Sequence, residues 1–287
     1  MAARPRTLPA AVAPVLVGTA LAATEGTFKV LTFIAAMLGA LFIQVGTNLS
    51  NDYSDARRGA DTEDRLGPVR VTAGGLSPPR QVLVATYVAF GLAVLAGVYL
   101  IVTAGWELLL VGAASILAGV LYTGGPRPYG YEGLGEVFVF LFFGLVAVTG
   151  SYFAQTEHLA WEAFVLAVPV GLLASAILIV NNVRDLETDR RAGKRTLAVR
   201  LGRSRTRGLY TGMVYLAFLC APLPWLLGSD DLSAWLLLSW AALPLAVPVV
   251  RIVRSRSDGP SLNGALARTG MLQLVFCALL SAGILAS

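Results

Sequence analysis

Residues 161–194 of the chain read WEAFVLAVPVGLLASAILIVNNVRDLETDRRAGK. The apolar part over 161–182 is long enough, as a helix, to cross the hydrocarbon core of a bilayer, which takes about 20 residues. Asp185, Asp189 and Lys194 follow it directly. Because ionisable groups beside lipid are costly and usually functional, this stretch predicts a membrane helix that ends in a functional site.

A second stretch repeats this pattern earlier in the chain. Residues 28–50 are mostly apolar, and an acidic and then basic segment follows them. Since each residue turns a helix by about 100°, the polar residues that end each helix fall on one stripe. The two stripes, here called the acidic boxes, contain Asn48, Asn51, Asp52 and Asp55 in the first helix, and Asn181, Asn182, Asp185 and Asp189 in the second.

The composition indicates a membrane protein. Of the 287 residues, 56% are hydrophobic and only 14% are charged, whereas soluble domains carry about 25% charged residues. The net charge of +5 would suit a nucleic-acid-binding protein. The basic residues, however, lie in short loops between apolar runs, as the positive-inside rule describes. This distribution is not a nucleic-acid footprint.

Apolar runs of similar length recur along the whole chain. They predict an all-α membrane protein with nine transmembrane helices, in which residues 1–287 form a single integral-membrane domain. The expected spans are 8–24, 28–50, 81–103, 106–123, 135–154, 161–182, 208–228, 232–251 and 266–286.

The charges also predict an orientation. With these spans, all 22 Lys and Arg residues except Lys29 lie on one side of the membrane, which makes that side cytoplasmic. We therefore expect a multi-pass protein of a bacterial cell (inner) membrane, with the N-terminus and the acidic boxes in the cytoplasm and the C-terminus outside. Basic loops at about 51–80 and 183–207 should cap the site.

The positions of the acidic boxes indicate an internal repeat. They end the second and the sixth expected helix, so a displacement of four helices preserves the direction across the membrane. We expect two parallel four-helix repeats plus a ninth helix. The site should then lie between the halves, close to the cytoplasmic surface.

The side chains of the boxes suit magnesium, which prefers oxygen ligands together with water and substrate phosphate. No His or Cys accompanies them, which disfavours zinc and copper. Nearby cations suit a diphosphate, whose oxygens a guanidinium can grip bidentately. The metal candidates are Asn48, Asn51, Asp52, Asp55, Asp61, Asp185 and Asp189, and the diphosphate candidates are Arg65, Arg70, Lys194 and Asn182.

Other basic residues and one aromatic segment admit two interpretations. For Arg200, Arg203, Arg205 and Arg207 we favour a role in setting topology only. Residues 122–136 form a Gly- and Pro-rich connection of fixed shape. Its three tyrosines would serve equally as an interfacial belt or as ring faces for a reaction partner. Tyr122 is the functional candidate among them because it is nearest to the membrane.

Several of these residues match known motifs. Asn51, Asp52 and Asp55 match the start of Asn-Asp-x-x-Asp-x-x-x-Asp. The second motif, Asp-x-x-x-Asp followed by Gly-Lys-x-Thr, is matched by Asp185, Asp189, Gly193, Lys194 and Thr196. On these residues the chain resembles the UbiA superfamily of intramembrane aromatic prenyltransferases, which implies nine transmembrane helices around a lateral portal.

One departure points to a branch of that family. Gly59 stands where the first motif has its last Asp, and the nearest acid is Asp61. This shift, together with the stretches 4–9, 59–70, 75–76, 122–126 and 181–185, resembles the branch that prenylates 1,4-dihydroxy-2-naphthoate. The likeness runs to about Gly202, and the last 85 residues match only in hydropathy.

The resemblance implies a metal-dependent electrophilic substitution. Two Mg²⁺ ions, one at each box, would bridge the diphosphate of a polyprenyl donor, and the naphthoate ring would attack the allylic cation. Loss of carbon dioxide and diphosphate would give demethylmenaquinone, a step of menaquinone biosynthesis. The implied catalytic residues are Asp55, Asp185, Asp189, Lys194 and Tyr122.

Other functions remain open at this point. Within the family, the acceptor would alternatively be 4-hydroxybenzoate, homogentisate or haem. Outside it, two acidic clusters in a parallel-repeat bundle would also suit an ion-coupled transporter. A transporter site, however, is expected near the midplane of the bilayer, whereas the boxes lie at helix ends beside basic loops.

Overall fold

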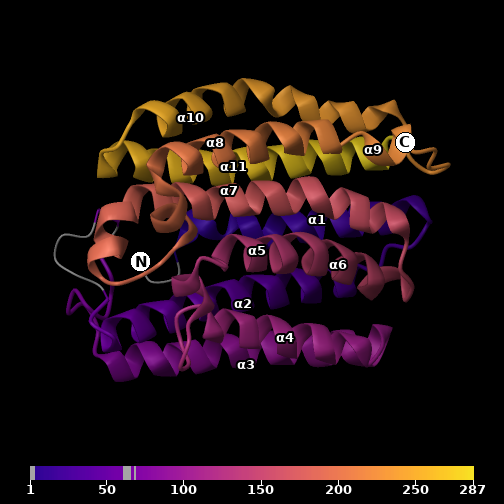
Figure 1. The fold of residues 1–287 in the computed structure, drawn as a ribbon. Coiled ribbons are helices and arrows are strands. Elements are labelled where there is room, and N and C mark those ends of the chain that lie inside the picture. The colour runs from indigo at the N-terminus through magenta and orange to yellow at the C-terminus, as the bar shows by residue number, and fades with distance from the viewer. Residues whose placement is uncertain (1–3, 61–65, 68) are drawn as a thin grey trace.

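The computed structural model describes residues 4–60, 66–67 and 69–287, and within them all regular secondary structure is helical (Figure 1). The long helices lie side by side along one direction. They are α1 (Pro9–Thr24), α2 (Val30–Arg57), α3 (Pro79–Ala104), α4 (Glu107–Leu121), α7 (Trp161–Arg191), α8 (Leu197–Cys220), α10 (Leu243–Ser255) and α11 (Gly259–Leu285).

The remaining elements are shorter. α5 (Gly135–Phe140), the π-helical η3 (Leu141–Val146) and α6 (Ala147–Thr156) follow one another without a break and form one long rod. Short 3₁₀ and α turns complete the described part: η1 (Pro5–Thr7), η2 (Tyr129–Glu132), α9 (Leu223–Leu226) and η4 (Ala234–Ala242).

Seven segments are long and apolar enough to span a bilayer, which confirms the class of integral membrane protein. They are Pro5–Thr24, Val30–Arg57, Pro79–Ala104, Gly135–Thr156, Trp161–Arg191, Ala234–Ser255 and Gly259–Leu285. The other two expected spans, 106–123 and 208–228, coincide with the short apolar α4 and with the second part of α8. The count of nine spans stays a prediction.

The helices differ from the expected spans chiefly at one end of the molecule. α2 and α7 continue to Arg57 and Arg191, past the expected ends at 50 and 182. The expected loop 183–207 is therefore mostly helical, because α8 already begins at Leu197 and only bends at Gly202 (φ 76°). Hydropathy marks the part of a helix that lies in lipid, whereas a helix can continue into the polar surroundings beyond it.

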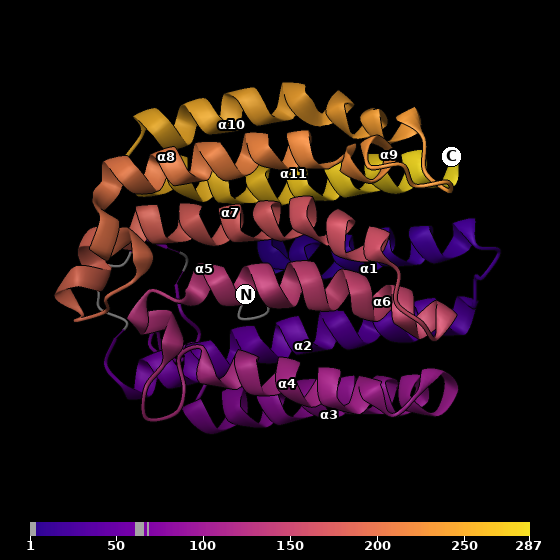
Figure 2. The ribbon, with the colours of Figure 1, turned by 45° about the vertical axis from the view of Figure 1, so that its right-hand side comes forward.

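α7 is the central helix of the bundle. Of its apolar window 78% is buried, compared with 28% for α2 and 22% for α3. Figures 1 and 2 show α8, α10 and α11 on one side of α7, and the α5–α6 rod, α2, α3 and α4 on the other, with α1 beside α7 and α11.

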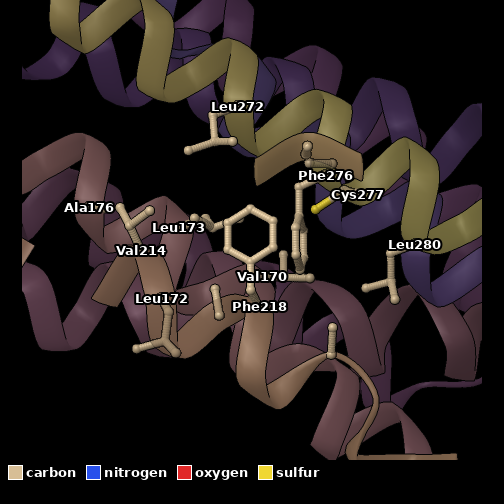
Figure 3. Close-up of a cluster of buried hydrophobic side chains, with 14 of the residues drawn as sticks. Val170, Leu172, Leu173, Ala176, Val214, Phe218, Leu272, Phe276, Cys277 and Leu280 are labelled. Atoms are coloured by element: carbon tan, nitrogen blue, oxygen red, sulfur yellow. The ribbon is translucent and has the colours of Figure 1, made fainter. Parts of the chain in front are cut away.

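The main core lies between α7, α8 and α11 (Figure 3). There the rings of Phe218 and Phe276 pack edge to face with centroids 5.0 Å apart, beside Leu173 and Cys277. In lipid such contacts stabilise through close packing rather than by removing apolar surface from water. The other cysteine, Cys220, is also a free and buried thiol, as the apolar surroundings of both predict.

Candidate active site

A cavity of about 470 Å³ opens between α2, α4, the α5–α6 rod and α7. At one end it is lined by side chains of both acidic boxes, and farther along by apolar side chains of α2, α3, α4 and α6. The two boxes, which are far apart in sequence, therefore face one space.

The two boxes end their helices in the same way. Gly59 (φ 64°) and Gly193 (φ 74°) each take the left-handed conformation that closes a helix. Behind Gly59, the N–H of Ala60 donates to the carbonyl of Asp55, and behind Gly193 the N–H of Lys194 donates to that of Asp189. Gly59, which departs from the family motif, is thus the residue that terminates α2. Asp55 and Asp189 occupy equivalent positions.

Asp55 contacts two cations and a phenol of the site. It is buried, and its Oδ2 lies 2.8 Å from Arg70 Nη2 and 3.6 Å from Lys194 Nζ. Its Oδ1 accepts a hydrogen bond of 2.5 Å from the hydroxyl of Tyr131. Two predicted diphosphate ligands, Arg70 and Lys194, therefore meet one predicted metal ligand.

Three more residues of the first box take different places. Asn48 and Asn51 line the cavity, and their side chains bond to Thr7 and Thr123. Asp52 is buried but does not line it, because its two oxygens accept the backbone N–H groups of residues 71 and 72 at 3.0 and 2.8 Å. Asp52 lies at one edge of the helical stripe, about 60° round from Asp55, so it faces this loop.

The second box points into the same cavity. Asp185, Asp189 and Asn182 all line it. Asp185 is held by a fork of two hydrogen bonds from the buried Arg184, at 2.8 and 2.6 Å. Asp189 lies 4.0 Å from Lys194 Nζ. Asn182 donates to Glu136 Oε1 at 2.8 Å, so part of its amide is already occupied.

The tyrosine segment forms an aromatic wall of the cavity. Tyr122 meets Tyr129 edge to face, and Tyr129 stacks on Phe138 with centroids 4.0 Å apart. Burial raises the pKa of Tyr129, whose hydroxyl donates to the Ala118 carbonyl at 2.8 Å. The rings therefore face the cavity rather than forming a belt against lipid.

Some residues of the site were not expected from the sequence. Tyr131 bonds to Asp55, and its ring lies 4.7 Å below the Lys194 ammonium. From the sequence alone, Tyr122 is the functional candidate among the tyrosines, because it is nearest to the membrane. Arg4 and Thr7 line the cavity beside Asn48. Both belong to the stretch 4–9 that carries the family resemblance, but neither is a candidate site residue from the sequence. The expected candidates Asp61 and Arg65 lie outside the described residues.

The oxygen groups present fit magnesium. Among the residues that the structure describes, no three His, Cys, Asp or Glu side chains converge to form a metal site. A metal here would therefore need amide, water and phosphate oxygens besides one or two carboxylates, which is the usual manner of binding magnesium. The buried hydroxyl of Thr196 also lines the cavity and has no hydrogen-bond partner in the described part, as expected beside a polar ligand.

Fold and site together define a class: an all-helical integral membrane protein with a carboxylate and cation cluster at one end of an apolar cavity. The chain belongs to the UbiA prenyltransferase family, whose profile matches residues 11–282.

Similar proteins match almost the whole chain. A 1,4-dihydroxy-2-naphthoate octaprenyltransferase from Mycobacterium tuberculosis is 44% identical over 284 residues, which cover 99% of this chain and 95% of that protein. One from Escherichia coli is 39% identical over 272 residues, or 93% and 88% of the two chains. A UbiA homolog from Aeropyrum pernix K1 superposes with a TM-score of 0.70 at 15% identity, covering 96% and 97%. At that identity the structural likeness shows the shared fold.

Proposed function

We propose that this protein transfers a polyprenyl group from polyprenyl diphosphate to 1,4-dihydroxy-2-naphthoate, with loss of carbon dioxide and diphosphate. Relatives with 39% and 44% identity carry the naphthoate prenyltransferase name and match over nearly their full length. The structural observation that carries the proposal is one cavity with a charged end and an apolar remainder. A diphosphate attached to a hydrocarbon chain has the same two parts.

We assign the metal-binding role to Asp55, Asp185 and Asp189, with Asn48 and Asn51 beside them, and expect two ions, one at each box. Asp61 belongs to the same assignment on sequence grounds alone. When bound, Mg²⁺ would offset the negative charge that develops on the leaving diphosphate. A UbiA homolog from Archaeoglobus fulgidus with this fold was solved bound to GPP and Mg²⁺, which supports a metal-dependent donor site.

The basic residues of the site would hold the diphosphate itself. Arg70 and Lys194 are buried and pair with Asp55. A donor diphosphate would share these cations with the carboxylate, and the planar guanidinium of Arg70 suits two phosphate oxygens at once. We also assign Asn182 to the diphosphate and, on sequence grounds alone, Arg65.

The transfer exchanges one bond for another without oxidation. The bond between the first prenyl carbon and the diphosphate oxygen breaks, and its electrons leave with the diphosphate. The naphthoate ring then attacks the allylic cation, and the carboxylate departs as carbon dioxide while its bonding electrons return to the ring. The product is therefore the reduced form of demethylmenaquinone. Tyr122 and the neighbouring rings would keep water from the cation.

We also propose the membrane arrangement that the charges predict: nine spans, two parallel four-helix repeats plus a ninth helix, and a cytoplasmic active site under the two basic segments. The identical helix ends at Gly59 and Gly193 support the repeat, because they make the two boxes equivalent.

A competition assay tests the proposed function. The purified protein in lipid nanodiscs receives Mg²⁺, one polyprenyl diphosphate and equal amounts of 1,4-dihydroxy-2-naphthoate, 4-hydroxybenzoate and homogentisate, and products are identified by mass spectrometry. We expect a prenylated naphthoquinol in at least tenfold excess over the others. A dominant product from another acceptor would reassign the substrate, and no prenylated product from folded protein would overturn the proposal.

A further inference from the structure

Asn263 of α11 lies behind the second acidic box and contacts two separate parts of the site. Its Oδ1 accepts a hydrogen bond of 2.7 Å from Arg184 Nη1. Its Nδ2 donates a bond of 3.0 Å to the backbone carbonyl of Leu66. This residue falls in the last 85 residues of the chain, where the sequence offers only hydropathy.

The first contact leads to Asp185. Arg184 is 2% exposed and does not line the cavity, so it lies behind the carboxylate that does. Besides its fork to Asp185, it donates to Asn181 Oδ1 at 2.7 Å. Asn263 is the partner that comes from another helix. A shift of this amide would therefore let the guanidinium turn, and the carboxylate would turn with it.

The second contact leads to Arg70. Leu66 lies four residues before Arg70 in the sequence, and Arg70 pairs with Asp55 of the first box. Directly after Arg70, the N–H groups of residues 71 and 72 donate to Asp52. Gly259 of α11 also lies against Leu66, where an added Cβ would be 3.1 Å from the Leu66 carbonyl oxygen. The start of α11 thus contacts Leu66 directly.

The two partners of Asn263 have opposite requirements. A guanidinium only donates hydrogen bonds, and a backbone carbonyl only accepts them. A side-chain amide meets both needs at once. A carboxylate of the same shape would still accept from Arg184 but would repel the carbonyl, and an alanine would meet neither need.

We propose that Asn263 is a positioning residue for the donor site: through Arg184 it sets the orientation of Asp185, and it also holds Leu66, which stands four residues before Arg70 in the chain. This inference rests on the proposed function, because the ligand it serves is the Mg²⁺-bound donor diphosphate. One amide on α11 thereby links the carboxylate of one box with the cation of the other. We expect its loss to weaken donor binding and to leave acceptor binding unchanged.

The test compares Asn263→Ala, Asn263→Asp and the matched control Gln273→Leu. Gln273 is a buried amide on the same helix, and in the described part of the chain it donates to the Val170 carbonyl, away from the boxes. Mg²⁺-dependent binding of farnesyl thiodiphosphate, a slowly ionising donor analogue, is measured by calorimetry, together with the melting temperature and the KM for the naphthoate. Asn263→Ala should bind the analogue about tenfold more weakly, as expected for a lost hydrogen bond to a charged group. Asn263→Asp keeps the bond from Arg184 and loses the one to Leu66, so its donor affinity should fall by a smaller factor.

The melting temperature separates positioning from plain stability. We expect Gln273→Leu to keep the wild-type donor affinity whatever its melting temperature, and the KM for the naphthoate to stay constant throughout. A loss of donor affinity that followed the melting temperature in all three variants would contradict positioning. Wild-type donor affinity in both Asn263 variants would overturn the inference and leave the proposed function standing. A wild-type chain that binds the analogue but forms no product would overturn the proposed function alone.

Discussion

Asp55 receives contacts from three segments that are distant in sequence: Arg70 from the segment after α2, Tyr131 from η2, and Lys194 from the turn after α7. The two cations and the phenol offset the cost of burying this carboxylate. Replacing Asp55 by a neutral residue would leave the buried cations of Arg70 and Lys194 without this counter-charge. The loss would lower stability as well as function.

The first prediction concerns the carboxylates. Asp189→Asn should lower the rate of prenyl transfer by at least about 10³-fold, since the developing charge would lose a metal ligand. The matched control is Glu187→Gln, because Glu187 lies on the same helix but is exposed, and its ion pairs in the described part of the chain are with Arg190 and Arg203. Surface pairs of this kind contribute about 0–1 kcal/mol, so its turnover should equal that of the wild type. Equal turnover in Asp189→Asn would refute the assignment.

The second prediction concerns the phenol that the sequence did not single out. Tyr131→Phe keeps the ring under Lys194 and removes only the hydroxyl that donates to Asp55. A hydrogen bond to a charged group contributes about 1.5–3 kcal/mol, so kcat/KM for the donor should fall at least about tenfold. Tyr53→Phe is the control, because among the described residues that hydroxyl accepts a bond from the exposed Arg57 and contacts neither box carboxylate. If both variants match the wild type, Tyr131 does not position Asp55.

At the scale of elements, the ends of α2 and α7 decide the site. Each helix continues past its apolar part and closes at a glycine with positive φ, which places Asp55 and Asp189 in the last turn. The turn at Gly193 also directs Lys194 back toward Asp189 and Asp55. Hydropathy locates the membrane part of such helices but says nothing of where the polar extension ends.

The third prediction tests this helix end. Gly193→Ala should destabilise the protein by about 1 kcal/mol, since a non-glycine residue is strained at φ 74°, and it should weaken donor binding by displacing Lys194. An added Cβ would meet no atom within 4 Å at Gly193, nor at the control position Gly208 inside α8. Gly208→Ala should instead stabilise the protein slightly, because Ala is the better helix former. If Gly193→Ala and Gly208→Ala lowered the stability equally, the positive φ at Gly193 would not be the cause of the loss.

The sequence predicts the helices and the acidic boxes well but not the contacts around them. Apolar length and helical spacing depend on local residues, so the spans and the shared stripes follow from them. The contacts of Tyr131 with Asp55 and of Asn263 with Arg184 join segments far apart in the chain, and no local pattern encodes them. Helical spacing alone also fails to place Asp52. It lies at the edge of the stripe, and its side chain bonds to the neighbouring loop instead of lining the cavity.

At the scale of the whole molecule, the polar ends of α2, α7 and α8 gather at one end of the bundle, opposite the C-terminus (Figures 1 and 2). The opposite end carries Lys29, paired with Glu157 at 2.7 Å. This pairing lowers the pKa of Glu157. All Lys and Arg residues except Lys29 fall on the other side of the expected spans, which predicts a cytoplasmic site. His158, next to Glu157 in the chain, is then expected on the outer side.

The fourth prediction tests that orientation. Cysteine is introduced singly at the exposed His158 or at the exposed Arg127, while Cys220 and Cys277 are buried and should stay unlabelled. In intact cells a membrane-impermeant maleimide should label His158→Cys and leave Arg127→Cys untouched until the membrane is opened. Labelling in the reverse order would invert the topology.

The central claim is a transfer in which the naphthoate loses its carboxylate as the prenyl group is attached. The most direct measurement uses 1,4-dihydroxy-2-naphthoate labelled in the carboxylate, and compares labelled carbon dioxide with prenylated product formed by the protein in nanodiscs with Mg²⁺ and donor. We predict equal molar amounts, and neither when Mg²⁺ is chelated or Asp189 is replaced by Asn. Prenylated product that retains the label, or carbon dioxide release without a donor, would contradict the account.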